Sequence, residues 1–459
     1  MRMEARVHII GAGLAGSQAA LTLARLGFRV VLSEMRPDVK TAVHKTDLCA
    51  ELVCSNSFKS KDANTAAGML KAELGLLGSE VWNIAVRCAV PAGGALAVDR
   101  DRFAAAVTEA VVCNPCITLV RGECASLEDA MRDADAVILA SGPLTSDALA
   151  ADIARVTGSA QLAFFDAAAP IVTADSLDMD VLFRQSRYDE GVGDYLNAAM
   201  SKERYNAFID ELLTAKRTIL HEFESKDLFQ ACQPIEEVAR TGRDAPRFGA
   251  LKPVGIVDPA TGRRPWANVQ LRAENAEGTC YNLVGFQTNL TFPEQARVFR
   301  MIPGLEQAEF ARYGVMHRNT FLNAPALLGA DLRLKFDAPR PVFVAGQLSG
   351  TEGYTEAIRS GLHAALHAAA LLRGCELPAL PRTSAFGALL AYATNSETTQ
   401  YQPSHVNFGL MPPLDTHVRN KAERHAVYAS RGMEDFAAYA DALASIGFIP
   451  QPTKEPGDE

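Results

Sequence analysis

The stretch RVHIIGAGLAGSQAALTLARLGFRVVLSE, residues 6–34, decides the fold. It begins with a short apolar run, continues into a glycine-rich turn at 11–16, and then has the apolar spacing of a helix that ends at Gly27. A second apolar run at 29–34 ends on an acid. This order of strand, tight turn, helix and strand predicts the β-α-β unit that binds dinucleotides.

The glycines of this turn have separate functions in such a unit. Gly11 allows the tight turn, Gly13 lets the backbone approach a pyrophosphate, and Gly16 lets the helix pack closely on the strand. The helix N-terminus faces the phosphates, and Glu34 is placed to bind ribose hydroxyls. A chance glycine turn is disfavoured because strand, helix and acid are in register. The predicted cofactor-binding residues here are Gly11, Ala12, Gly13, Leu14, Ala15, Gly16 and Glu34.

A second strand, glycine-rich loop and long helix lie at 340–372, in RPVFVAGQLSGTEGYTEAIRSGLHAALHAAALL. A helix N-terminus beside a flavin stabilises its anionic reduced form, which favours FAD over NAD as the dinucleotide. The alternative is a plain glycine turn before a core helix. Gly346, Gly353 and Tyr354 complete the predicted cofactor-binding residues. No other G-x-G-x-x-G follows a strand, so a separate NADPH-binding domain is not expected.

These two pieces predict an α/β fold, with a Rossmann-like FAD-binding domain of glutathione-reductase type split by an α+β insertion domain. Helical spacing in SKERYNAFIDELLTAKRTIL (201–220) and alternation in TCYNLVGFQTNL (279–290) mark the insertion. The predicted parts are the first FAD-binding part at 1–150, the insertion on the RNA or substrate side at 151–330, the second FAD-binding part with C-terminal helices at 331–445, and a polar tail at 446–459.

Composition limits the function classes. The 459-residue chain is 48% hydrophobic and 22% charged, as in ordinary soluble globular proteins. Its formal net charge of -9 argues against non-specific polyanion binding, so a nucleic-acid partner needs a local basic site. The start has no leader pattern, and no apolar run approaches the roughly 18 residues of a membrane span. Nine sparse cysteines without zinc spacing predict reduced thiols, no metal and a cytoplasmic location without membrane attachment.

Three sets of cysteines carry candidate chemistry. Cys113 and Cys116 form a C-x-x-C, but a strand-like run follows them, which favours a loop coincidence over a redox pair. Cys49 and Cys54, in CAELVCSNSFKS, have the spacing of the dithiol in glutathione-reductase-like flavoenzymes, which carry the second dinucleotide domain not expected here. Cys232 lies among basic residues that favour a thiolate and suit a phosphate backbone; a buried structural cysteine is the alternative.

Several longer motifs identify a family. They are GAGLAGSQAA, VHKTDLCAELVCSNSFKS, VPAGGALAVDRDRF, ASGPLTS, FQACQPIEEVARTG, LKPVGI and AGQLSGTEGYTEAIRSG. Together they closely resemble the folate- and FAD-dependent tRNA uracil-5-methyltransferases, the TrmFO family, which is related to the GidA or MnmG flavoproteins. The resemblance implies that the one-carbon unit of 5,10-methylenetetrahydrofolate moves to C5 of a uridine in the T loop of tRNA, leaving tetrahydrofolate. FADH2 is the implied reductant, regenerated with NAD(P)H.

The resemblance also implies two catalytic cysteines. Cys232 matches the cysteine of the family's C-Q-P-I-E-E motif and is the expected nucleophile at uracil C6, since addition there makes C5 nucleophilic. Cys54 matches the cysteine of E-L-V-C-S-N-S, near the flavin, and is expected to act as acid or base at C5 or to hold a resting adduct. Cys49 is a local variation on the family pattern, which disfavours a dithiol.

Four further residues carry over from the same motifs. His44 and Asn56 flank Cys54 and are expected to line the folate or flavin pocket, with a structural role equally open for the histidine. Arg100 and Arg102 are expected to serve a domain interface or a phosphate.

Other functions stay open at this point. They are the same chemistry on ribosomal RNA, a thiol-disulfide flavin oxidoreductase, and a flavin-binding module of an RNA-modifying complex. The MnmG function is disfavoured because the chain ends soon after 445, without the long helical extension that those proteins use for their partner. No obligate protein partner is expected.

Overall fold

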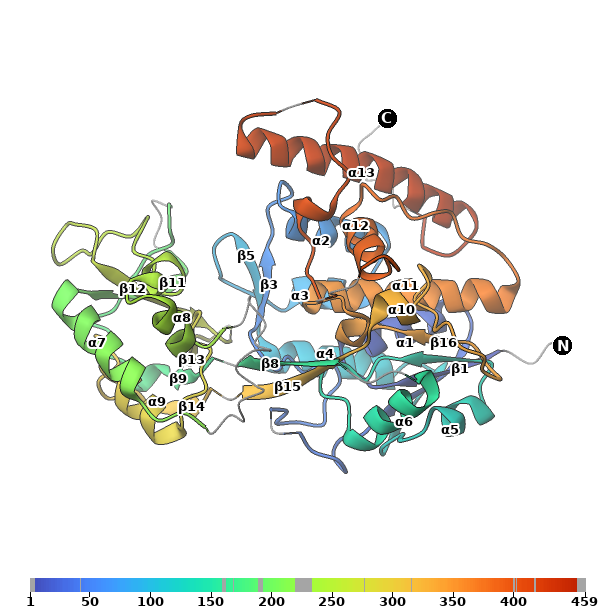
Figure 1. Ribbon diagram of the computed structural model, residues 1–459, viewed down its shortest axis with the longest axis horizontal. Helices are drawn as coiled ribbons and strands as arrows, with labels where there is room; N and C mark the ends of the chain where they lie inside the picture. Colours follow the sequence, from blue (N-terminus) through green and yellow to red (C-terminus); the bar gives the residue numbers. More distant parts are fainter. Residues whose placement is uncertain are drawn as a thin grey trace.

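The structure is a computed structural model with two lobes (Figure 1). It describes residues 5–41, 43–158, 162–167, 169–188, 193–218, 233–275, 277–314, 316–398, 401, 403–416 and 418–451, with the backbone alone at 162–167 and 316–319. The antiparallel strands β8 (Leu162–Ala167) and β15 (Met316–Phe321) lie between the lobes. The larger lobe contains the first and last described residues of the chain, and the smaller lobe contains the described part of the insertion between β8 and β15.

A five-stranded parallel sheet forms the centre of the larger lobe, in the order β16-β7-β1-β2-β6. Its strands are β1 (Arg6–Ile10), β2 (Arg29–Glu34), β6 (Ile117–Arg121), β7 (Ala136–Leu139) and β16 (Val342–Val344). The predicted strands at 6–10 and 29–34 are confirmed. Since β16 pairs with β7, the two predicted pieces of the FAD-binding fold share one sheet, and the carboxyl ends of its strands form the edge where ligands bind in such folds.

Helices α1 (Leu14–Arg25) and α11 (Tyr354–Arg373) cross in close contact over this sheet. A Cβ on Gly361 would stand 2.2 Å from the carbonyl oxygen of Ala15, so only glycine permits this crossing. A Cβ on Gly16 would stand 1.8 Å from the carbonyl oxygen of Gly11. The packing function predicted for Gly16 is therefore confirmed, because any side chain would push the helix off the turn.

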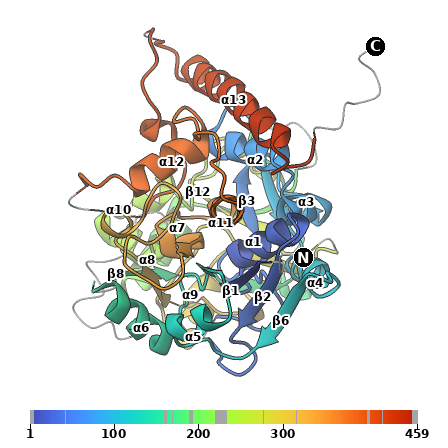
Figure 2. The ribbon, with the colours of Figure 1, turned by 90° about the vertical axis from the view of Figure 1, so that its right-hand side faces the viewer.

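Further helices cover the same lobe (Figure 2). Buried Glu73 accepts the N–H groups of Ala385 at 2.5 Å and Phe386 at 3.3 Å and thereby caps α12. The buried guanidinium of Arg359 lies 4.6 Å from the ring centre of Phe386. The further helices of the larger lobe are α2 (Ala66–Leu76), α3 (Glu80–Arg87), α4 (Arg100–Val112), α5 (Leu127–Arg132), α6 (Asp147–Thr157), α10 (Ala324–Leu327), α12 (Ala385–Ala393) and α13 (Lys421–Ser445). The lobe also contains a small sheet of β3 (Ser57–Ser60), β4 (Ala89–Val90) and β5 (Ala95–Val98).

The smaller lobe is a six-stranded antiparallel sheet in the order β10-β11-β12-β13-β9-β14, with helices packed on it. Its elements are β9 (Ile171–Thr173), β10 (Phe183–Arg184), β11 (Tyr195–Met200), α7 (Lys202–Thr214), α8 (Ile235–Thr241), β12 (Ala267–Ala273), β13 (Cys280–Leu283), α9 (Phe292–Phe299) and β14 (Phe310–Arg312). This α+β texture agrees with the predicted insertion, while the boundaries at 150 and 330 stay predictions.

Two predicted elements of the insertion are shorter than their sequence patterns. Helix α7 ends at Thr214 because the chain then pairs with another segment: Thr291 donates its N–H to the carbonyl of Lys216 at 3.0 Å, and Thr218 donates to Asn289 at 2.9 Å. Strand β13 ends at Leu283 because Gly285 turns the chain with a φ of 79°. Within the described residues, no helix combines the length and apolarity of a membrane span, and no cluster of three metal-binding side chains occurs.

Candidate active site

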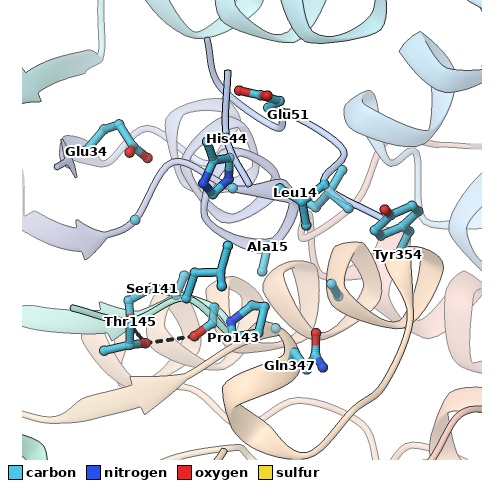
Figure 3. Close-up of a pocket in the computed structure, with 18 of the residues that line it drawn as sticks. Leu14, Ala15, Glu34, His44, Glu51, Ser141, Pro143, Thr145, Gln347 and Tyr354 are labelled. Carbon is cyan, nitrogen blue, oxygen red and sulfur yellow. Dashed lines mark hydrogen bonds between the residues drawn. The ribbon is translucent and has the colours of Figure 1, made fainter. Parts of the chain in front are cut away.

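A cavity of about 350 Å³ opens at the carboxyl ends of the parallel strands. Figure 3 shows Glu34 on one side and Tyr354 on the other, with His44, Leu14 and Ala15 between them. Cys54 lies on its wall. The predicted residues that line the cavity are Gly11, Gly13, Leu14, Ala15, Glu34, His44, Cys54, Gly346, Gly353 and Tyr354. Among the predicted cofactor-binding residues, Ala12 and Gly16 lie behind this wall, where the first is buried and the second packs against the turn.

Helices α1 and α11 both begin at the cavity and have N-termini without side-chain caps in the described structure, whereas Ser146, which also lines the cavity, caps α6 with its side chain. The N-caps are Gly13 for α1 and Gly353 for α11. Elsewhere in the lobe, Thr65, Ser79 and Asp99 cap their helices with side-chain oxygens. The first N–H groups of an uncapped helix are available to a ligand, and the helix dipole favours a negative one. Two such ends at one cavity form a site for anionic groups.

Gly13 supplies the test of whether a dinucleotide fits. No described atom lies within 4 Å of the position that a Cβ on Gly13 would take, and its φ of -71° is ordinary for any residue. Neither packing nor conformation within the protein therefore requires glycine here, whereas the close approach of a pyrophosphate does. The residues present fit the diphosphate of FAD.

Glu34 is held by a buried basic residue that the sequence analysis missed. Its carboxylate accepts the N–H of Ala12 at 3.0 Å and the Nε–H of Arg36 at 2.8 Å. Arg36 also donates to Glu51 at 3.1 Å. Burial alone would raise the pKa of Glu34, but the hydrogen bonds and charge of Arg36, with help from the N–H of Ala12, lower it. Glu34 therefore stays ionised at neutral pH at the end of β2, where a ribose would bind.

The Cys54 loop is fixed from three directions. Tyr354 accepts the N–H groups of Cys54 at 2.9 Å and Ser55 at 3.2 Å on its hydroxyl oxygen. Arg100 and Arg312 each donate to the carbonyl oxygen of Cys54 at 2.9 Å. Burial and then the nearby Cys54 raise the pKa of Tyr354, so its hydroxyl stays protonated and keeps a donor at the cavity wall.

The other cysteines differ from Cys54 in their surroundings. Cys49 is fully buried, does not line the cavity, and has its pKa raised, mainly by burial, so it is a poor thiolate. Both Cys49 and Cys54 are free thiols. Cys113 and Cys116 are also free and lie between the end of α4 and β6, as the loop interpretation predicts.

Cys232 lies outside the described residues, and the chain is described again from Gln233. Two residues later, the N–H of Ile235 donates to the carbonyl of Gln287 at 2.7 Å. Gln287 lines the same cavity as Cys54. The described chain that follows Cys232 is thus attached to the cavity wall.

The prediction that Asn56 lines the pocket is wrong. Asn56 is completely buried and joins the two lobes: its amide donates to the carbonyls of Val98 and Ala273, each at 3.0 Å, and its oxygen accepts Nε–H of Arg272 at 2.8 Å. The sequence motif could not distinguish a pocket amide from a buried one. His44 does line the cavity, and its Nδ1 lies 2.7 Å from the hydroxyl of Thr41.

Arg100 serves the expected interface between the lobes, whereas Arg102 has an exposed side chain. Arg100 pairs with Glu274 after β12 and also donates to the carbonyl of Leu52.

Replacing Arg100 with Ala should lower the free energy of unfolding by about 3–5 kcal/mol, because Glu274 would be left buried without its partner. Urea unfolding of the variant measures this. Arg102→Ala is the control and should change stability by less than about 0.5 kcal/mol; equal effects of the two would contradict the assignment.

Known proteins share the sequence of this chain over most of its length. The model of the "Glucose inhibited division protein A" family matches residues 6–376. The chain is 52% identical over 439 residues to the methylenetetrahydrofolate--tRNA-(uracil-5-)-methyltransferase TrmFO of Desulforudis audaxviator, covering 95% of this chain and 98% of that protein. The chain belongs to the TrmFO family. The TrmFO protein of Moorella thermoacetica is 50% identical, with 94% and 98% of the two chains covered.

Solved structures support the same fold. Aquifex aeolicus GidA in its form II crystal superimposes with a TM-score of 0.66 at 16% identity, covering 95% of this chain and 74% of that one. The form I crystal gives a TM-score of 0.64 at 15% identity. The family resemblance and the predicted fold class, a Rossmann-like FAD-binding fold with an insertion, are therefore confirmed.

Proposed function

We propose that this TrmFO-family chain transfers the one-carbon unit of 5,10-methylenetetrahydrofolate to C5 of a uridine in the T loop of tRNA. FAD, reduced with NAD(P)H, supplies the hydride, and the protein acts in the cytoplasm without an obligate protein partner. The name of its relatives, which describes folate-dependent methylation of uracil in tRNA, supports the substrates. The observation that carries the proposal is one cavity with two uncapped helix ends, an ionised Glu34 and Cys54.

The cavity residues divide the binding of FAD between them. The N–H groups at the start of α1, beside Gly13, would bind the diphosphate, and Glu34 would bind the ribose hydroxyls. The start of α11, at Gly353 and Tyr354, would favour negative charge on the flavin ring. When bound, FAD supplies the hydride that completes the methyl group.

Two cysteines act on the uridine in this proposal. The thiolate of Cys232 adds to C6 and makes C5 a nucleophile towards the folate methylene, whose bonds to the two folate nitrogens break in turn. The proton on C5 then leaves, hydride transfer completes the methyl group, and Cys232 departs from C6 as a thiolate. Cys54 accepts the C5 proton or holds a covalent adduct in the resting enzyme, and its position on the cavity wall supports this role. The products are 5-methyluridine, tetrahydrofolate and oxidised flavin.

The test is a reaction with separate RNA substrates. The purified chain should be yellow and should form 5-methyluridine in unmodified tRNA when given methylenetetrahydrofolate and NADPH. A matched reaction with ribosomal RNA tests the neighbouring function. Product in ribosomal RNA alone would show that ribosomal RNA, and not tRNA, is the substrate. The absence of product in both RNAs, with FAD bound, would refute the proposal. The thiol-disulfide alternative is not favoured, because Cys49 is buried away from the cavity.

A further inference from the structure

Three aromatic rings stack at the edge of the smaller lobe. Phe292, the first residue of α9, stacks on Tyr313 with ring centres 4.8 Å apart and an interplanar angle of 12°. Tyr313 stacks in turn on Phe310 of β14 at 4.9 Å and 14°. Phe310 packs against the core of this lobe, while Phe292 is 50% exposed. The stack therefore runs from the core to the surface and ends on an exposed aromatic ring.

A buried amide holds the two chain segments of this stack together. Gln295 of α9 is fully buried; its side-chain amide donates to the carbonyl of Gly314 at 2.8 Å and its oxygen accepts the N–H of Gly314 at 2.7 Å. Gly314 directly follows Tyr313. Since Gln295 and Phe292 lie on the same helix, this paired contact fixes the rings relative to each other. A stack preorganised in this way gains affinity for a flat ligand because little ordering is needed on binding.

The stack lies next to the candidate active site. Arg312, which precedes Tyr313, donates to the carbonyl of Cys54 at 2.9 Å. Lys45 donates from its ammonium to the carbonyl of Ala311 at 3.4 Å, and this side of the loop also carries the cavity residue His44. Tyr313 of the stack therefore directly follows Arg312, whose side chain binds the carbonyl of Cys54.

Two exposed lysines, Lys45 and Lys216, border the stack through backbone contacts. Exposed Lys216 accepts the N–H of Thr291 on its carbonyl, directly before Phe292. Local cationic charge on a chain of net charge -9 is the kind of focused site that a nucleic-acid partner requires.

We propose that the stack of Phe292, Tyr313 and Phe310, here called the ring platform, receives an unstacked T-loop base next to the target uridine. The base lies on the exposed face of Phe292, and the adjoining phosphates lie near Lys45 and Lys216. This inference rests on the proposed tRNA substrate. Proteins that bind unpaired RNA combine aromatic stacking with cationic side chains along the backbone, and a base next to a flipped-out target loses its own stacking partner.

The test compares variants of the FAD-loaded enzyme. Phe292→Ala should raise Kd and KM for tRNA about tenfold, as expected for one lost base-aromatic stack, with kcat and the KM for methylenetetrahydrofolate within about twofold. Phe292→Leu keeps an apolar contact without an aromatic face and should show the same loss, whereas Phe292→Tyr should bind like wild type. Phe248 is 83% exposed, so Phe248→Ala is a matched control for the loss of a surface ring and should leave tRNA binding unchanged.

A second measurement does not depend on the folding of variants. A T-loop stem with 5-iodouridine beside the target uridine should crosslink to Phe292 of the wild-type enzyme on irradiation, because this base crosslinks to an aromatic ring on which it stacks; peptide mapping locates the crosslink. Unchanged tRNA affinity in Phe292→Leu, or a crosslink to other residues only, would overturn the proposal. A raised KM for methylenetetrahydrofolate alone would also overturn it and would assign the platform to the pterin ring. If tRNA binding depends on Phe292 but no methyl group is transferred, the ring platform stands and only the proposed function is refuted.

Discussion

Replacement of Gly13 with alanine is expected to give a folded protein that loses FAD. The added Cβ meets no described atom within 4 Å, so the fold has no reason to change. It would, however, occupy the space through which the first turn of α1 contacts the diphosphate. Loss of charge-assisted hydrogen bonds worth about 3 kcal/mol would weaken FAD binding roughly a hundredfold. Flavin absorbance per polypeptide after gel filtration measures the loss.

Gly75 provides the matched control for this substitution. It lies inside α2, and a Cβ there also meets nothing within 4 Å. Gly75→Ala should therefore retain FAD and gain up to about 1 kcal/mol of stability from its better helix propensity. A Gly13→Ala protein that is as yellow as wild type would show that the diphosphate does not pass this turn.

Replacement of Cys232 with alanine is expected to abolish methylation, with a fall of at least about a thousandfold in kcat. Without a thiolate at C6 the uracil ring has no enolate, so C5 cannot attack the methylene carbon. FAD binding should be unchanged, because the helix ends and Glu34 that are proposed to bind FAD belong to the larger lobe, whereas Cys232 belongs to the predicted insertion. Single-turnover formation of 5-methyluridine measures the effect.

The other thiols separate this chemistry from a general effect of cysteine loss. Cys54→Ala should also reduce turnover strongly, because Cys54 lies on the cavity wall. Cys49→Ala should retain most activity, since Cys49 is buried behind that wall. Wild-type turnover in Cys232→Ala would assign the nucleophile elsewhere.

The β-α-β unit was predictable because its signals are local. Gly11, Gly13 and Gly16 serve a turn whose strand and helix are their immediate neighbours, so spacing alone defines the geometry. The return of the chain to the same sheet at β16 was also predictable, since the loop from Gly346 to Gly353 repeats the same strand, glycine loop and helix order.

The partners of Cys54 could not be read from the sequence in the same way. Arg100 and Arg312 reach one carbonyl oxygen from positions 46 and 258 residues along the chain, and only the docking of the two lobes brings them together. Arg36 is close to Glu34 in sequence, but its second partner Glu51 depends on the path of the intervening loop. The prediction for Asn56 was wrong for the same reason, because its side-chain amide donates to backbone carbonyls of both lobes.

The most direct test of the account traces the origin of the methyl carbon. Wild-type enzyme is incubated with tRNA, NADPH and methylenetetrahydrofolate whose methylene carbon is carbon-13. The RNA is then digested, and the masses of the nucleosides are measured by mass spectrometry. The 5-methyluridine formed at the T-loop uridine should carry the heavy carbon in its methyl group, and Cys232→Ala should form none. Unlabelled product, or label that enters only from S-adenosylmethionine, would contradict it.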